Sequence, residues 1–358
     1  MDTAARQRGL DALRAAAALA VVVIHVSATA LQHVAPGSAD WWFADLYHAA
    51  TVWAVPVFVM ISGALLLDPA RSDTARAFLT RRAGRILVPL AFWSALYLGV
   101  RYYRGQVDAM QAMVDLLFGL PFAHLWYLYM AAGLYLVTPP LRVFVAAARP
   151  TELRYATFLA LAIGIAANET GYLIGLPSAL AVLLFAPFVG YYLLGHLLRD
   201  WWSGAGKGSA GELSSPLFLM GVAAAATAVT AIGTGLIRQG FPDFTGWKIL
   251  CDQLSPTVMA AAVAVYLTAP AIERGSGTAA AAIKCAGTWV APYALGIYVV
   301  HPLVMMGLEG VGLSAVALGT AAGVPAVSVA VFLLSLGLCR VLALVPGARM
   351  VIGIGARD

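Results

Sequence analysis

Charged residues are scarce in this chain of 358 residues. Only 11% of them are Asp, Glu, Lys or Arg, against roughly a quarter in water-soluble domains, while 61% are hydrophobic. One or two soluble cores cannot enclose so much apolar surface. The composition therefore excludes an ordinary soluble protein and predicts an all-α polytopic membrane protein that lies in a lipid bilayer.

Cysteine is also scarce, and its pattern argues against a metal or disulfide framework. Cys251, Cys285 and Cys339 lie far apart, with no Cys-x-x-Cys or His/Cys spacing typical of a metal site. We therefore expect no metal and no permanently bound cofactor. The net charge of +5 comes mainly from arginines between apolar runs. Because the chain offers no solvated basic face, we expect no nucleic-acid partner.

Ten apolar stretches are long enough, or nearly long enough, to cross a bilayer, which takes about 20 helical residues. They run from about Leu10 to Leu31, Leu46 to Leu67, Ile86 to Val100, Leu125 to Val145, Ala156 to Ala167, Ala179 to Leu198, Pro216 to Ile237, Pro256 to Ile272, Trp289 to Leu308 and Val324 to Leu344. We predict a bundle of about ten transmembrane helices. It would form a single domain over residues 1–358, with no appended soluble domain.

Basic residues gather in the loops that follow the even-numbered stretches. Five arginines lie between positions 71 and 85, and further basic residues lie at Arg149, Arg154, Arg274 and Lys284. By the positive-inside rule, this distribution predicts that both termini are cytoplasmic. The N-terminus imitates a cleavable signal peptide, but cleavage would discard the ionisable residues of the first stretch. We therefore expect an uncleaved first span.

Arg14 and His25 are the most informative residues of the first stretch. At about 100° per residue, 11 steps return a helix to within about 20° of its starting face, so both side chains share one stripe. With a rise of about 1.5 Å per residue they lie roughly 16 Å apart, which places His25 near the middle of the membrane. Ionisable groups at that depth usually face a protein interior or a water-filled path and are functional.

Other polar residues come to comparable depths on later helices. Ser62 and Gly63 fall near the level of Arg14, and His301 returns to mid-membrane depth near His25. Pro302 follows His301 and permits a kink beside a cavity. His124 and Trp126 begin the fourth stretch at the outer face. We expect them to be interfacial, either structural or on the acceptor side.

A basic cluster lies where the third helix enters the membrane. Arg81, Arg82 and Arg85 belong to the string FLTRRAGRILVP, and guanidinium groups bind phosphate in a bidentate manner. Considered alone, the cluster is more typical of an orientation signal or of contact with lipid headgroups. A phosphate-binding site is the alternative interpretation.

Four strings occur together in a characteristic order. They are Arg14 followed after ten residues by His25, VFVMISGA at 57–64, RRAGRILVP at 81–89 and LGIYVVHPLV at 295–304. Together they resemble the acyltransferase-3 family of integral membrane acyltransferases, over nearly the whole chain. The string HLWYLYMAAGLYLVTP at 124–139 is similar to the branch that contains surface-polysaccharide O-acetyltransferases.

The resemblance implies a ten-helix enzyme of a bacterial-type inner membrane. It would transfer an acyl group, which we expect to be acetyl, from cytoplasmic acyl-CoA as co-substrate to a hydroxyl of a cell-surface glycan or glycolipid. Arg14 and His25 match the essential pair of the family, and Ser62 and Gly63 match its Ser-Gly on the second helix. The three arginines at 81, 82 and 85 match its basic motif. The resemblance thus assigns acyl-CoA binding to Ser62, Gly63 and these three arginines.

The chemistry of acyl transfer suits these residues. Moving an acyl group from a thioester to an alcohol requires a base for the alcohol proton or a nucleophile that carries the acyl group, and imidazole serves either purpose. We expect His25 to act in one of these ways. Arg14 would hold a CoA phosphate or the thioester carbonyl. Asp11, one turn earlier, either orients Arg14 or is a simple helix N-terminal charge. His301 is either a second acid/base in a tunnel or a structural core histidine.

Two other functions suit a polytopic chain with buried histidines. A transporter or flippase of a glycan precursor should show matched halves with broken helices, or acidic residues at mid-membrane, and the carboxylates here can be placed in loops or near helix ends. A sensor module that uses the fold for recognition alone is the third alternative. Release of free CoA from an acyl-CoA distinguishes an enzyme from both.

Overall fold

The computed structural model describes residues 3–71, 73–174, 180–199, 215–241 and 244–354. Within these residues all regular structure is helical, which confirms the predicted fold class. The α-helices are α1 (Thr3–Leu31), α2 (Ala39–Ala49), α3 (Ala54–Leu66), α4 (Ala75–Tyr103), α5 (Ala109–Leu117), α6 (Trp126–Ala147), α7 (Pro150–Ile174), α8 (Val189–Leu197), α9 (Pro216–Gly240), α10 (Pro256–Tyr266), α11 (Ala269–Arg274), α12 (Thr278–Val290), α13 (Ala294–Gly310), α14 (Thr320–Leu342) and α15 (Ala348–Val351). Short 3-10 turns are η1 (Ala181–Leu183), η2 (Ala186–Phe188), η4 (Thr245–Leu250) and η5 (Ala291–Tyr293).

Nine helical stretches in the described part of the chain are long and apolar enough to cross a membrane. The sequence predicted about ten. The difference lies in the sixth predicted stretch, which forms η1, η2 and the nine-residue α8 and gives no single long helix. Pro187 stands in the first turn of η2, where its missing N–H costs no hydrogen bond but prevents a longer helix from running through.

The second predicted stretch is a helix with a break. It consists of α2 and α3, separated by residues 50–53. Pro56 lies in the first turn of α3 and cannot donate to the carbonyl four residues earlier, so the helix restarts close to it. Thr51 in the break uses its hydroxyl to donate to the carbonyl of Tyr47 at 2.7 Å. This break bends the chain beside the middle of α1.

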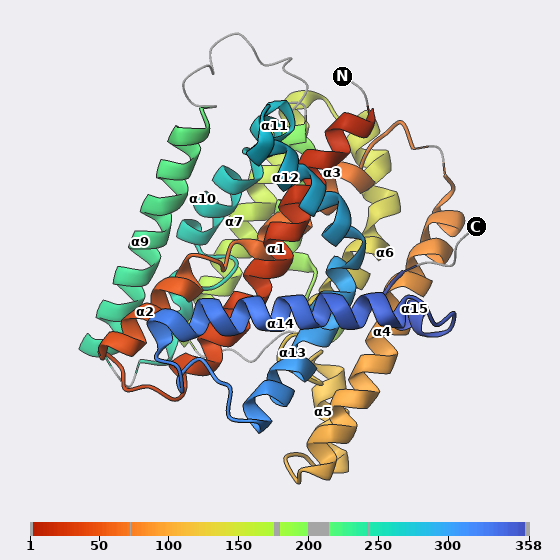
Figure 1. The fold of residues 1–358 in the computed structure, drawn as a ribbon. Coiled ribbons are helices and arrows are strands. Elements are labelled where there is room, and N and C mark those ends of the chain that lie inside the picture. The colour runs from red at the N-terminus through yellow and green to blue at the C-terminus, as the bar shows by residue number, and fades with distance from the viewer. Residues whose placement is uncertain (1–2, 72, 175–179, 200–214, 242–243, 355–358) are drawn as a thin grey trace.

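Helix α1 lies at the centre of the bundle. It contacts α2, α3, α11, α12, α13 and α14, and Figure 1 shows it, in red, running diagonally through the other helices. At its N-terminal end it lies beside α11, where Glu273 accepts from the backbone N–H of Gly9 at 2.8 Å. Its side chains join two separate clusters of buried apolar residues, one of which includes Val21 and the other Leu13.

Helices α7 and α9 form part of the outer surface. They expose large apolar side chains, among them Phe158 and Ile163 on α7 and Ile232 and Leu236 on α9. Apolar surface of this extent is unfavourable in water and suits contact with lipid tails. The helices nearest the centre therefore remain available to bury polar groups.

Helices α3 and α8 cross at unusually close range. Gly63 on α3 lies against the backbone of Tyr192, and Gly195 on α8 lies against the backbone of Met60. A Cβ atom added at either glycine would overlap a carbonyl oxygen of the opposite helix. Only glycine permits the two backbones to approach in this way.

We expect Gly63→Ala and Gly195→Ala to destabilise the protein by about 1–3 kcal/mol each, since the added methyl forces two backbones apart. The measurement is the midpoint of thermal unfolding in detergent. Gly99→Ala on α4 is the matched control, because no atom lies within 4 Å of the added Cβ. Equal midpoints for the α3 and α4 variants would contradict the close crossing.

Candidate active site

His25 on α1 and His301 on α13 lie side by side in the interior. Their ring centroids are 4.8 Å apart, with the ring planes inclined at 58°. His301 is fully buried, whereas His25 keeps part of its surface accessible. The two helices are far apart in the sequence, and the site exists because α13 packs along α1.

The hydrogen bonds of both rings define which nitrogen is basic. Nδ1 of His25 lies 2.8 Å from the carbonyl oxygen of Val21, and Nδ1 of His301 lies 2.7 Å from that of Tyr298. A carbonyl accepts only, so in the neutral rings Nδ1 carries the proton and donates it. Nε2 of each ring then holds a lone pair, and that of His301 has no partner. The arrangement supplies two nitrogen bases.

His124 is the third member of this histidine cluster, and here the structure corrects the sequence analysis. His124 is fully buried, with ring centroids 5.3 Å from His301 and 6.1 Å from His25. The sequence analysis expected an interfacial side chain, whereas this ring is enclosed by protein. The segment before α6 turns into the bundle, so that helix α6 begins in the interior. Neither ring nitrogen of His124 has a hydrogen-bond partner.

Trp126 does not contact the histidine cluster by any ring contact in the described residues. It is half-buried and stacks near Phe188, with ring centroids 5.6 Å apart. One of the aromatic residues that do contact the histidine cluster is Tyr298, whose ring centroid lies 5.3 Å from that of His124. Its hydroxyl donates to the backbone carbonyl of His124. Tyr127 packs on the other side of Tyr298 at 5.1 Å.

A cavity of about 490 Å³ opens beside this aromatic pair. Tyr127 and Tyr298 line it at one end, and Arg14, Arg82 and Arg85 line it elsewhere. Its volume is typical of sites for small molecules or cofactors, which occupy roughly 300–1,000 Å³. We call this space the arginine cavity. Tyr298 thus lies between the arginine cavity and the histidine cluster.

Arg14 has a partner at the wall of the arginine cavity. Its Nη1 lies 2.8 Å from Oδ1 of Asp11, one turn earlier on α1, and both residues line the cavity. The pairing fixes one edge of the guanidinium group, and the group keeps further N–H donors. Arg71, which the sequence analysis did not single out as a ligand, also lines the cavity.

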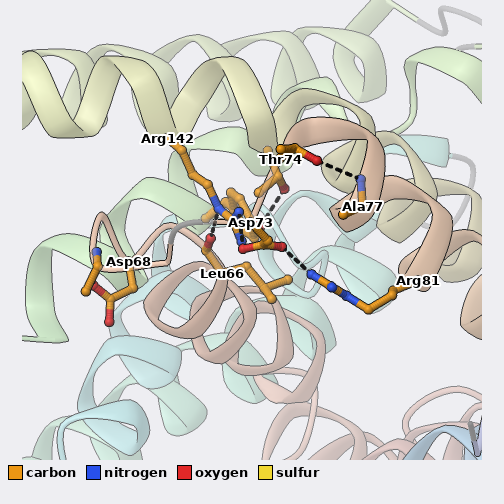
Figure 2. A network of polar contacts seen from close by, with 10 residues as sticks. Leu66, Asp68, Asp73, Thr74, Ala77, Arg81 and Arg142 are labelled. Carbon is orange, nitrogen blue, oxygen red and sulfur yellow. Dashed lines mark hydrogen bonds and ion pairs between the residues drawn. The ribbon is translucent and has the colours of Figure 1, made fainter.

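Arg81 is held away from the arginine cavity. Its Nη2 lies 2.6 Å from Oδ2 of Asp73, and Nη1 of Arg142 lies 3.1 Å from Oδ1 of the same carboxylate (Figure 2). Burial opposes ionisation of Asp73, but the guanidinium of Arg142 and then that of Arg81 hold its pKa below the usual value. Arg142 also donates to the carbonyl of Leu66 at 2.6 Å. This network ties the start of α4 to the end of α3.

Ser62 and Gly63 separate in the structure, although they are neighbours in the sequence. Ser62 lines the arginine cavity and donates its hydroxyl to the carbonyl of Phe58 at 2.9 Å. Gly63 does not line it and packs instead against α8. A helix turns by about 100° per residue, so adjacent residues face different surroundings.

The profile of the acyltransferase-3 family, described as an acyltransferase domain, matches residues 7–343. The chain belongs to this family. No curated protein and no solved structure gave a match. An acyltransferase-3 protein is an enzyme that uses an acyl donor, and the nine candidate spans make this one an integral membrane protein. The transporter and sensor alternatives are therefore not favoured.

Arg82 and Arg85 are the arginines of the basic motif that line the arginine cavity, so we expect Arg82→Ala and Arg85→Ala to raise the apparent KM for acetyl-CoA. The increase should be about tenfold, because a hydrogen bond to a charged group contributes about 1.5–3 kcal/mol. The kcat should change less, since contacts far from the reacting carbonyl bind ground state and transition state alike. Donor titrations of the purified variants measure both constants.

Arg76→Ala is the control for this experiment. Arg76 lies on the same helix, is exposed and does not line the arginine cavity. Its replacement removes one positive charge without removing a cavity residue. If all three variants gave the same KM for acetyl-CoA, the arginines would serve only membrane orientation.

Proposed function

We propose that this acyltransferase-3 protein is an O-acyltransferase of a bacterial-type cytoplasmic membrane. It takes an acyl group, acetyl in our proposal, from cytoplasmic acyl-CoA and transfers it to a hydroxyl of a cell-surface glycan or glycolipid. The chain acts as one transmembrane domain. The proposal extends the family activity to a donor, an acceptor class and a set of residues.

The observation that carries the proposal is the position of the basic Nε2 atoms. His25 and His301 both direct Nδ1 to backbone carbonyls; the ring centroid of His301 lies 6.1 Å from that of Tyr298, which lines the arginine cavity, and His25 lies beside His301. Arginines bind phosphate groups, which CoA carries, and imidazole is a base near neutral pH. A donor that enters among the arginines brings its thioester toward the histidines.

The transfer itself requires one bond to form and one to break at the acyl carbon. In direct transfer, Nε2 of His25 takes the proton of the acceptor hydroxyl, whose oxygen attacks the thioester carbonyl. The carbon–sulfur bond then breaks, and the CoA thiolate receives the proton. In the covalent alternative, Nε2 of His25 attacks first and carries the acyl group to the hydroxyl. Both routes convert one thioester and one alcohol into one ester and CoA.

The other polar residues support this step from fixed positions. Arg14, paired with Asp11, holds a donor phosphate or the thioester carbonyl at the cavity wall. His301 lies 4.8 Å from His25 between ring centroids and accepts or returns the proton. His124 contacts both rings, so we assign it to the reacting group as a hydrogen-bond partner of the acyl or hydroxyl oxygen.

We expect His25→Ala to lower kcat by about 10²–10⁴-fold, the usual contribution of a positioned base. His124→Phe keeps an aromatic ring of similar size but removes both nitrogens, and it should lower kcat at least tenfold. Acetyl-CoA binding should survive in both variants, because neither residue lines the arginine cavity. The rates and the donor affinity are measured on purified protein. Unchanged rates in His25→Ala would contradict the mechanism.

The basic loops support an arrangement in which the donor enters from the cytoplasm. If both termini are cytoplasmic, the arginine cavity opens inward, and the acceptor approaches from the outer side. In sealed vesicles of this orientation, acetyl-CoA trapped inside should acylate a membrane-impermeant acceptor outside. His25→Ala vesicles are the control for leakage and for chemical transfer. Product formed only when both substrates share the inner compartment would contradict this arrangement.

A further inference from the structure

A second cavity, of about 470 Å³, lies at the other end of the same two helices. It is lined by Val26, Thr29 and Ala30 from the end of α1, by His33 in the turn that follows, and by Met305 and Glu309 from the end of α13. The arginine cavity uses the beginnings of these helices, with Asp11 and Arg14 on α1 and Ala294 to Tyr298 on α13. The two cavities therefore lie on opposite sides of the histidine cluster.

The second cavity comes within one helical turn of both bases. Thr29 follows His25 by four residues, and Met305 follows His301 by four residues, so each lies on the same helix face as its histidine. A rise of about 6 Å separates each pair along the helix axis. On the other side, Tyr298 precedes His301 by three residues and lines the arginine cavity. Residues that line the two cavities thus lie one helical turn before and one turn after His301, and one turn after His25.

The fully buried part of the wall of the second cavity is apolar, and the half-buried Thr29 and Ser314 each add one hydroxyl. Val26, Ala30, Met305, Ala315 and Val327 are all buried, and none of them offers a side-chain hydrogen bond to a hydroxyl group. The exposed polar residues are placed differently. His33 and Glu309 line the cavity and are solvent-exposed, so they form its rim.

The apolar buried wall and the polar rim together restrict the acceptors that fit the second cavity. A fully hydroxylated sugar ring would place several hydroxyls against aliphatic side chains, and each buried hydroxyl without a partner is unfavourable. A ring that carries a methyl group or hydrogen beside its reacting hydroxyl meets no such penalty. Polar groups on the rest of the acceptor remain at the rim, near His33 and Glu309.

We propose that the second cavity is the acceptor site and that it takes a deoxy sugar unit or a similarly hydroxyl-poor alcohol. This inference rests on the proposed O-acyltransferase function and adds the class of acceptor. The reacting hydroxyl enters past Thr29 toward Nε2 of His25, while the apolar wall covers the deoxygenated side of the ring. The enzyme then distinguishes a deoxy sugar from a fully hydroxylated sugar by the hydroxyl that the deoxy sugar lacks.

The experiment uses the full chain in nanodiscs, with acetyl-CoA as donor and two acceptors that differ by one hydroxyl. These are methyl L-fucoside and methyl L-galactoside, of which the former lacks the 6-hydroxyl. We expect kcat/KM to favour the fucoside by at least about tenfold, a ratio expected when one hydroxyl is buried without a partner. Equal values, a preference for the galactoside, or transfer to neither while acetyl-CoA is still hydrolysed would overturn the inference.

A variant tests the location of the site. Ala317→Trp introduces a bulky ring at an exposed residue that lines the second cavity, and Leu318→Trp does so at its exposed neighbour, which does not. The first variant should raise the KM for methyl L-fucoside at least tenfold, while the second should leave it unchanged. Leu318→Trp should also leave the KM for acetyl-CoA and the rate of acetyl-CoA hydrolysis unchanged.

These readouts separate the inference from the function on which it rests. If Ala317→Trp left the acceptor KM unchanged while Arg82→Ala still raised the donor KM, the acceptor site would be elsewhere and the acyltransfer would stand. If the wild-type protein released no CoA from acetyl-CoA under any condition, the proposed function itself would fail, and the acceptor site with it.

Discussion

A polar side chain inside an apolar bundle loses its hydrogen bonds to water, and the fold must replace them or leave the atom bare. The central histidines are arranged by this constraint. His25 and His301 each direct one nitrogen to a carbonyl oxygen of the preceding turn of their own helix, so the backbone supplies the partner. The opposite nitrogen is directed away from that turn. Burial thereby orients the ring and selects its tautomer in one step.

The close packing of helices makes this arrangement rigid. Glycines at crossings, such as Gly63 and Gly195 between α3 and α8, let backbones meet where any side chain would hold them apart. Helices that approach so closely leave little free volume between them. Two cavities lie in the described part of the chain, one toward each end of α1 and α13.

Charge is distributed between binding and structure in the basic region. Arg81 and Arg142 share the carboxylate of Asp73, which secures the connection from α3 to α4. Arg82 and Arg85 follow on the same helix and line the arginine cavity. A run of arginines thus serves two purposes, because successive residues on a helix face different directions. Arg81 and Arg142 thereby hold the start of α4, the helix that carries Arg82 and Arg85 in the wall of the arginine cavity.

Composition and periodicity determined the class of this protein. Apolar runs predicted an all-helical membrane bundle, and an 11-residue spacing placed Arg14 and His25 on one face of α1. Local chemistry along one helix is readable from the sequence because the geometry of the helix is fixed. Only the tertiary structure decided which helices meet. In the folded chain His124 is buried, and Arg81 and Gly63 do not line the arginine cavity. The sixth predicted span forms several short helices. These outcomes depend on contacts between residues distant in the chain, for which the spacing along a single segment carries no information.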